Sequence, residues 1–126
     1  MMFHAASMRG FTLIELLVVL VILGLVTGIA APALVAANDR ARLNDAAVRL
    51  HDDLRRARSF AVMQGDPVTL DARTALGDNS IHIAGARPLT FYPDGSATSM
   101  HMTLALGAHR RFLTVDWLTG RATLAE

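Results

Sequence analysis

The pattern of apolar and polar positions divides the chain near residue 38. Residues 16–37 contain no charged side chain and are almost entirely apolar. A helix needs roughly 20 such residues to cross a bilayer. We therefore predict a membrane-spanning helix that begins near Phe11 and ends near Ala37, with a short polar leader before it.

A secretory signal peptide is the alternative interpretation of this run. Leu16–Val26 would then be its apolar core, and the small residues of "ALVAAN" would form its cleavage site. Glu15 argues against this interpretation, because such a core normally lacks an acid. The helical pattern that continues after Ala37 argues against it as well, so a retained helix is favoured.

Three helix-perturbing residues recur at intervals of four within the run, namely Gly24, Gly28 and Pro32. They share one helix face, on which another helix could approach closely. Pro32 also removes the backbone hydrogen bond to the carbonyl of Gly28 and is expected to kink the helix. The alternative is that Gly and Pro are simply frequent in membrane helices, and spacing alone does not separate the two.

From residue 38 to about Gln64 the pattern stays helical but becomes amphipathic, and Gly65 and Pro67 end it. One helix of roughly 50 residues is therefore expected, the first half in the membrane and the second outside it. The apolar face of the second half recurs at intervals of three and four and consists of Leu43, Ala47, Leu50, Leu54, Ala57 and Ala61.

After Gly65 the apolar period changes to two, which predicts short antiparallel strands separated by turns. Trp117 alternates with Leu113 and Val115 and is expected in the core with them. The apolar helix face at 43–61 would cover one side of the sheet. The predicted strands are 67–72, 80–84, 88–92, 100–106, 112–118 and 121–125, with turns at 93–96 and 119–120.

These elements predict an α+β fold, in which a long N-terminal helix, membrane-spanning and then amphipathic, packs on a small antiparallel β-sheet domain. The expected organisation has four parts. They are a leader at 1–10, a transmembrane helix at 11–37, an amphipathic helix at 38–64 and a β-rich domain at 65–126.

Composition excludes several classes of function. The 126 residues suffice for one small domain, and the absence of cysteine excludes disulfides and thiol chemistry. The net charge of +1 implies neither a nucleic-acid nor an acidic partner. Residues 59–126 carry five Arg against six Asp and Glu, so the C-terminal part is not a basic module.

The sequence contains no catalytic constellation. His82, His101 and His109 lack the spacing of a metal-binding motif and are interpreted as surface or strand-face residues. No serine lies in a G-x-S-x-G elbow. We therefore expect a protein that is not an enzyme and that has no metal or cofactor.

The N-terminal stretch carries a specific resemblance. A leader ending in Gly10, followed by "FTLIELLVVLVILGLVTGIAAPAL", closely resembles the class III signal of type IV pilins and type II secretion pseudopilins. Further along, "LRRARSFAVMQGDPVTL", "FYPDGSAT" and "VDWLTGRATL" resemble the GspH/FimT family of minor pseudopilins and minor pilins.

The resemblance implies a series of processing and assembly steps. A prepilin peptidase would cut after Gly10 on the cytoplasmic face of the inner membrane and methylate the new amine of Phe11. The helix would stay in the lipid, with the C-terminal domain in the periplasm, until an assembly platform in the inner membrane moves the subunit into a pseudopilus with other major and minor pseudopilins. By charge alone, Arg40, Arg42 and Arg49 after the helix favour the opposite orientation.

Two interpretations of Glu15 follow, and they are compatible. Within one chain, Glu15 could pair with the Phe11 amine four residues earlier and interact favourably with the helix dipole. Between chains, it could pair with the Phe11 amine of a neighbouring subunit, which would satisfy a carboxylate that costs on the order of 3 kcal/mol to insert. The resemblance favours the second interpretation, so Glu15 is the predicted assembly residue.

Two other functions remain open. FimT-like members of the family include proteins that bind DNA for uptake through a basic Gly-Arg-x-Arg stretch. Here the matching positions read Gly120-Arg121-Ala122-Thr123 and lack the second arginine. Nucleic acid is therefore not the expected partner. The third possibility is a membrane-anchored domain with no role in a filament.

Overall fold

The computed structural model describes residues 10–126, and the predicted leader therefore lies almost entirely outside the described residues. The chain forms two compact units, which divide between Val35 and Ala36. In order, the elements are α1 (Leu13–Gln64), β1 (Val68–Leu70), α2 (Ala72–Leu76), β2 (His82–Ala84), β3 (Leu89–Phe91), β4 (Met100–Leu106), β5 (His109–Val115) and β6 (Ala122–Ala125).

Helix α1 contains an apolar segment long enough to cross a membrane, with a mean hydropathy of 2.8 over 18 residues. No part of that segment is buried within the chain. Its large apolar side chains are exposed all round the helix, so they require lipid or other helices as their surroundings. Pro32 lies inside α1, which continues through it. The kink at Pro32 stays a prediction.

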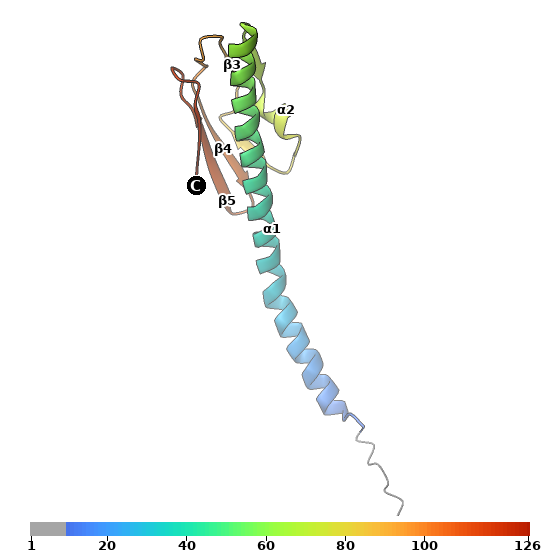
Figure 1. Ribbon diagram of the computed structural model, residues 1–126. Helices are drawn as coiled ribbons and strands as arrows, with labels where there is room; N and C mark the ends of the chain where they lie inside the picture. Colours follow the sequence, from blue (N-terminus) through green and yellow to red (C-terminus); the bar gives the residue numbers. More distant parts are fainter. Residues whose placement is uncertain (1–9) are drawn as a thin grey trace, which may run out of the picture. The chain divides into compact units, whose positions relative to one another are not determined.

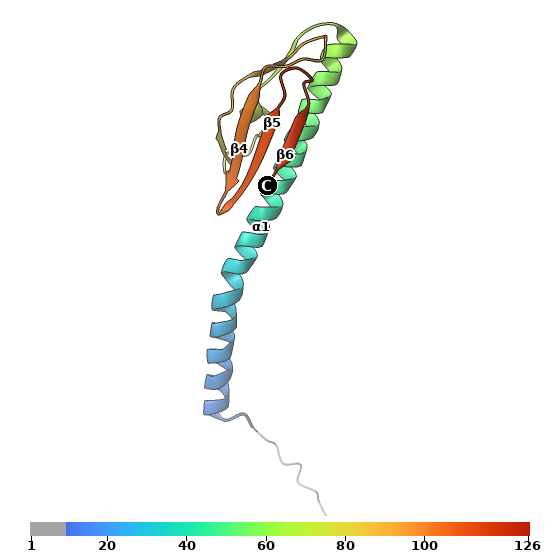
Figure 2. The ribbon, with the colours of Figure 1, turned by 90° about the vertical axis from the view of Figure 1, so that its left-hand side faces the viewer.

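The second half of α1 supplies one side of the core of the unit Ala36–Glu126. The six apolar residues predicted on one face are the six buried residues of the helix. They join a single hydrophobic cluster with buried strand residues, the largest of which include Phe91, Leu104 and Leu113. The strands lie along this part of the helix in both views (Figure 1, Figure 2). The predicted α+β class is confirmed.

The strands form two antiparallel sheets. A four-stranded sheet has the order β2-β4-β5-β6, and β1 pairs with β3 in a separate two-stranded sheet. In the larger sheet, β4 and β5 pair along their whole length, from Met100 opposite Val115 to Leu106 opposite His109. Figure 2 shows β4, β5 and β6 side by side. The sequence analysis predicted antiparallel strands but not their division into two sheets.

Trp117 is not a core residue, and that prediction was wrong. Strand β5 ends at Val115, and the side chain of Asp116 accepts hydrogen bonds from the backbone N–H groups of Leu118 and Thr119. The chain therefore turns before the alternation reaches Trp117, which is 60% exposed. The predicted turn at 119–120 exists as part of a longer connection, in which the Gly120 N–H donates to the carbonyl of Asp116.

Two further elements differ from prediction. Strand β5 begins at His109, three residues before its predicted start, because a two-residue turn at Gly107 and Ala108 joins it directly to β4. The expected strand at 67–72 is shorter because α2 begins at Ala72. Asp71 caps α2 by accepting a hydrogen bond from the Arg73 N–H at 2.9 Å.

Replacing Leu50 by alanine tests the packing of α1 on the sheets. Leu50 is fully buried, so Leu50→Ala is expected to lower the free energy of unfolding by roughly 2–5 kcal/mol. The measurement is urea unfolding of residues 38–126, followed by far-ultraviolet circular dichroism. Val48→Ala, on the exposed side of the same helix, is the control and should be nearly neutral. Equal losses from both variants would contradict this account of the core.

Candidate functional site

The start of α1 is built by Thr12 and Glu15. The Thr12 hydroxyl accepts a hydrogen bond from the Glu15 backbone N–H at 3.2 Å, and the Thr12 carbonyl accepts the first helical bond from Leu16. Thr12 is thus the N-cap residue, and Glu15 lies at the third helical position. The spacing Thr-x-x-Glu is the signature of a capping box. That signature could have identified Thr12 from the sequence, but the sequence analysis missed it.

The carboxylate of Glu15 is left available by this arrangement. The cap uses only the backbone of Glu15, and its side chain makes no hydrogen bond or ion pair with any residue from 10 to 126. An acid in the first turn also interacts favourably with the positive end of the helix dipole. Glu15 can therefore serve the helix start and still accept a cation from outside the chain.

Gly10 and Phe11 precede the helix and are exposed, Phe11 by 83%. The bond between them is outside any helix or strand, where an enzyme can reach it. Their predicted roles, as the cleavage site and as the methylated terminus, stay predictions. The remainder of the leader lies outside the described residues.

The predicted packing face is open in the single chain. A Cβ atom added at Gly24 or Gly28 would meet no atom within 4 Å. Thr27 carries the one side-chain hydroxyl of residues 16–37, and this hydroxyl donates a hydrogen bond to the carbonyl of Leu23. A hydroxyl in lipid requires such a partner. The face is therefore free to receive another helix, but its use as a contact stays a prediction.

A basic cavity of about 610 Å³ lies between α1 and the β5–β6 connection. The side chains of Arg55, Arg58 and Arg121 line it, and no acidic residue does. None of these three arginines forms an ion pair with another residue in the range 10–126. Counting charges by sequence segment missed this cluster, because Arg55 and Arg58 belong to the helix and Arg121 to the strand region.

The walls of the basic cavity are tied together by hydrogen bonds. Arg58 Nε donates to the carbonyl of Gly95 at 3.2 Å, and His51 Nε2 lies 3.1 Å from the carbonyl of Ala122. Gly120 has a φ of 63°, and a Cβ there would lie 2.2 Å from the Gly95 oxygen. Only glycine fits this close approach, which brings the β5–β6 connection against the turn between β3 and β4.

Aspartates fix the two turns near the basic cavity. Hydrogen bonds from the backbone N–H and the hydroxyl of Thr119 lower the pKa of Asp116 below its ordinary value. Hydrogen bonds from the hydroxyl and the backbone N–H of Ser96 lower the pKa of Asp94 in the same way. Both carboxylates are therefore ionised at neutral pH, and both turns keep their hydrogen bonds there.

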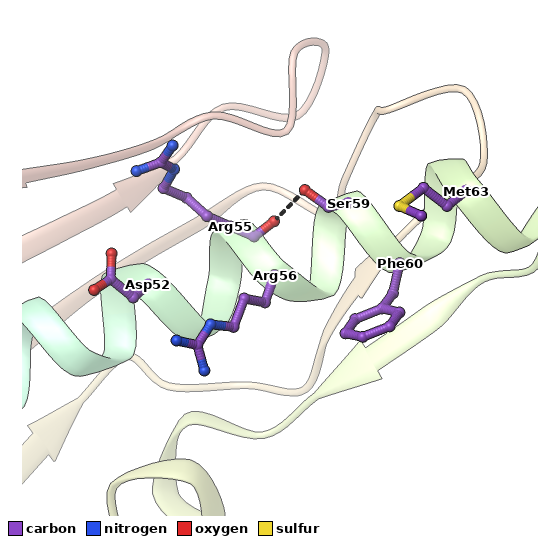
Figure 3. A pocket seen from close by; sticks show the side chains of 6 residues that line it. All are labelled: Asp52, Arg55, Arg56, Ser59, Phe60 and Met63. Carbon is purple, nitrogen blue, oxygen red and sulfur yellow. Dashed lines mark hydrogen bonds between the residues drawn. The ribbon is translucent and has the colours of Figure 1, made fainter.

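A second hollow, of about 410 Å³, lies along the C-terminal part of α1 (Figure 3). All of its lining side chains project from the helix, and Arg55 and Arg56 point to different sides of it. The lining consists of Asp52, Arg55, Arg56, Ser59, Phe60 and Met63. The Ser59 hydroxyl donates a hydrogen bond to the Arg55 carbonyl. None of the side chains drawn with it accepts its proton as a general base would.

The histidines do not converge. His82 and His101 are exposed strand residues, paired with Ala105 and Thr114 respectively. His109 Nε2 lies 3.1 Å from the carbonyl of Ala36. Within residues 10–126, no group of three or more His, Asp or Glu side chains is placed to hold a metal ion.

The N-terminal part of the chain matches a known family model. The family model described as the prokaryotic N-terminal methylation motif matches residues 6–31. The matched segment contains Gly10, Phe11 and Glu15, together with the first turns of α1. No curated protein and no solved structure matches the chain. The motif and the apolar helix that carries it indicate a type IV pilin-like or pseudopilin subunit, anchored in the membrane by a single helix.

Proposed function

We propose that the protein is a minor pseudopilin, a structural and non-enzymatic subunit at or near the tip of the pseudopilus of a type II secretion system. The methylation motif carries this proposal, because it places Gly10, Phe11 and Glu15 together at the start of an apolar helix. The resemblance of the C-terminal domain to the GspH/FimT family supports the choice of a minor secretion subunit.

In this proposal the subunit has two states. In the first, α1 is a single-pass anchor in the inner membrane, and the C-terminal domain lies in the periplasm. In the second, the apolar half of α1 lies among the helices of the filament. The same exposed apolar surface serves both states, because lipid and neighbouring helices are equally apolar surroundings.

Glu15 acts in the second state. Its carboxylate has no partner within residues 10–126, and peptidase action at Gly10 would create a cationic amine at Phe11 of every subunit. Pairing that amine with the Glu15 carboxylate of a neighbour removes the cost of an unpaired charge in apolar surroundings. The pair would therefore favour assembly over solitary residence in the bilayer.

A second candidate function is that of a FimT-like minor type IV pilin, acting in pilus assembly or DNA uptake. The basic cavity favours it, because three arginines without acidic neighbours provide donors for phosphate groups. Trp117 is exposed close by in the same connection and could stack on a base. The small number of cations argues against it, and the secretion subunit remains our conclusion.

Processing at Gly10 is tested with Gly10→Val. The branched side chain should block cleavage, because the peptidase requires a small residue in an accessible, extended site. The mature fraction is measured by mass spectrometry after co-expression with a prepilin peptidase. Gly24→Val, inside the helix, is the matched control and should be processed normally. Cleavage of Gly10→Val at the same bond would show that the peptidase interpretation is incorrect.

Assembly through Glu15 is tested with Glu15→Ala. Cleavage should remain largely intact, whereas recovery of the subunit in sheared or cross-linked filaments should fall several-fold, because the neighbour's amine loses its partner. Glu15→Asp keeps the charge and should retain part of the incorporation. Incorporation of Glu15→Ala at the level of the unaltered protein would remove Glu15 from the assembly contact.

The choice between secretion and DNA uptake is tested by a gel shift with residues 38–126. We expect no submicromolar binding of duplex or single-stranded DNA at physiological salt, since three clustered arginines release few counterions. Submicromolar binding that is lost in Arg55→Ala/Arg121→Ala, but kept in Arg87→Ala, would instead establish the second candidate function.

A further inference from the structure

The turn between β4 and β5 lies beside a particular stretch of α1. Gly107 and Ala108 form this turn, and the flanking residues Leu106 and His109 pair with each other. Gly107 has a φ of 58°, and among residues 10–126 no residue other than glycine has a positive φ. The turn therefore has a positive φ at its first position only, as in the type II′ hairpins in which glycine is required there.

One polar contact and one close approach place the turn beside α1. The His109 ring nitrogen Nε2 lies 3.1 Å from the carbonyl oxygen of Ala36. A Cβ on Gly107 would lie 3.0 Å from a carboxylate oxygen of Asp39, so the turn and this side chain are in close contact. The turn is thus level with residues 36–39 of the helix.

Residues 36–39 are where the apolar run ends. Ala36 and Ala37 are the last residues of the uncharged stretch, and Asn38 and Asp39 are the first polar ones. When residues 16–35 span the hydrocarbon core, residues 36–39 lie in the headgroup layer. The turn that contacts them is then at the same depth.

The chemistry around the turn suits this position. Gly107 and Ala108 are uncharged and exposed, and the charged group nearest to Gly107 is the carboxylate of Asp39. Arg110 follows the turn and Arg40 lies on α1, both are exposed, and both line a small cavity of about 180 Å³. Arginine is suited to lipid phosphate, because its planar guanidinium presents several donors.

The charged residues around the turn are Arg40, Arg110 and Arg111 against Asp39 and Glu126, which leaves a local net charge of +1. Glu126 lies 2.8 Å from Arg111 and 4.0 Å from Arg40, so its main partner is Arg111. Arg110 has no ion pair with any residue from 10 to 126. Arg40 and Arg110 can therefore turn to phosphates while Glu126 stays paired.

We propose that the membrane-proximal surface, defined as Gly107 and Ala108 with Arg40 and Arg110, binds the anionic headgroups of the leaflet from which α1 emerges. The inference rests on the membrane-anchored state of the proposed function and adds a second point of membrane contact to it. The contact would hold the domain upon the bilayer before assembly and would be broken when the subunit leaves the membrane.

Spin labels test the depth of the turn. The chain has no cysteine, so a single-cysteine variant of the full protein is labelled at one site only. Ala108→Cys is labelled in vesicles of phosphatidylethanolamine and phosphatidylglycerol, and its accessibility to oxygen and to a water-soluble nickel complex is measured. Leu23→Cys in the apolar run and Thr119→Cys in the connection between β5 and β6 are the controls. The accessibility of the label at residue 108 to the nickel complex should lie between the values of the two controls.

Two results would overturn the proposal, and they are distinguishable. In the first result, the labels at residues 108 and 119 are equally accessible to the nickel complex, while the label at residue 23 is protected by lipid. This result would refute the membrane contact and leave the proposed anchor intact. A label at residue 23 that is itself open to nickel would refute the membrane-spanning state, and the contact with it.

Removing the charges tests the role of the arginines. The double variant Arg40→Gln/Arg110→Gln should raise the accessibility of the label at residue 108 to the nickel complex toward that at residue 119. The same increase is expected for the unaltered arginines in vesicles without phosphatidylglycerol. Arg87→Gln, an exposed arginine in the connection between β2 and β3, is the matched control and should have no effect. An unchanged label in both the double variant and the neutral vesicles would overturn the headgroup binding.

Discussion

A single helix must satisfy two different surroundings, and the rest of the protein depends on how it does so. Within a bilayer the backbone polar groups need partners inside the segment, and α1 provides them from the bond between Leu16 and Thr12 onward, except at Pro32, which has no N–H to donate to the carbonyl of Gly28. Its apolar half is exposed on all sides, whereas its second half is apolar only on the stripe from Leu43 to Ala61. That stripe is where the strands obtain their core, since two short sheets alone would bury too little apolar surface.

The N-terminus of α1 combines structural and chemical roles in few residues. Thr12 caps the helix through the backbone N–H of Glu15, which leaves the Glu15 carboxylate for another partner. The methylation motif covers this same stretch. An acid that is costly in lipid is therefore placed where the helix dipole lowers its cost and where a cationic terminus would arise beside it. The pairing of Glu15 across subunits is the interaction on which the proposed assembly rests.

Exposed arginines gather at two places along α1. Toward the C-terminal end of α1, Arg55, Arg58 and Arg121 line a cavity whose wall includes Gly120. Near residues 36–39, the uncharged turn lies against Asp39, and Arg40 and Arg110 line a small cavity beside it. Arginines in both places are exposed, but only those at the membrane-proximal end lie level with the end of the apolar run. Position along α1 thus separates two surfaces that composition cannot distinguish.

The sequence by itself determined the long helix, its buried stripe and the methylation motif, because helical periodicity and the Gly-Phe-Thr-Leu-Ile-Glu pattern are local properties. It also located β4 correctly from strict alternation between Met100 and Leu106. Only the tertiary structure decided the rest. Trp117 left the core because the Asp116 side chain turned the chain, and the β4–β5 turn was missed because Arg110 and Arg111 hide the alternation of β5. The basic cavity and the membrane-proximal surface join residues distant in sequence, so they exist only once the strands pack on α1.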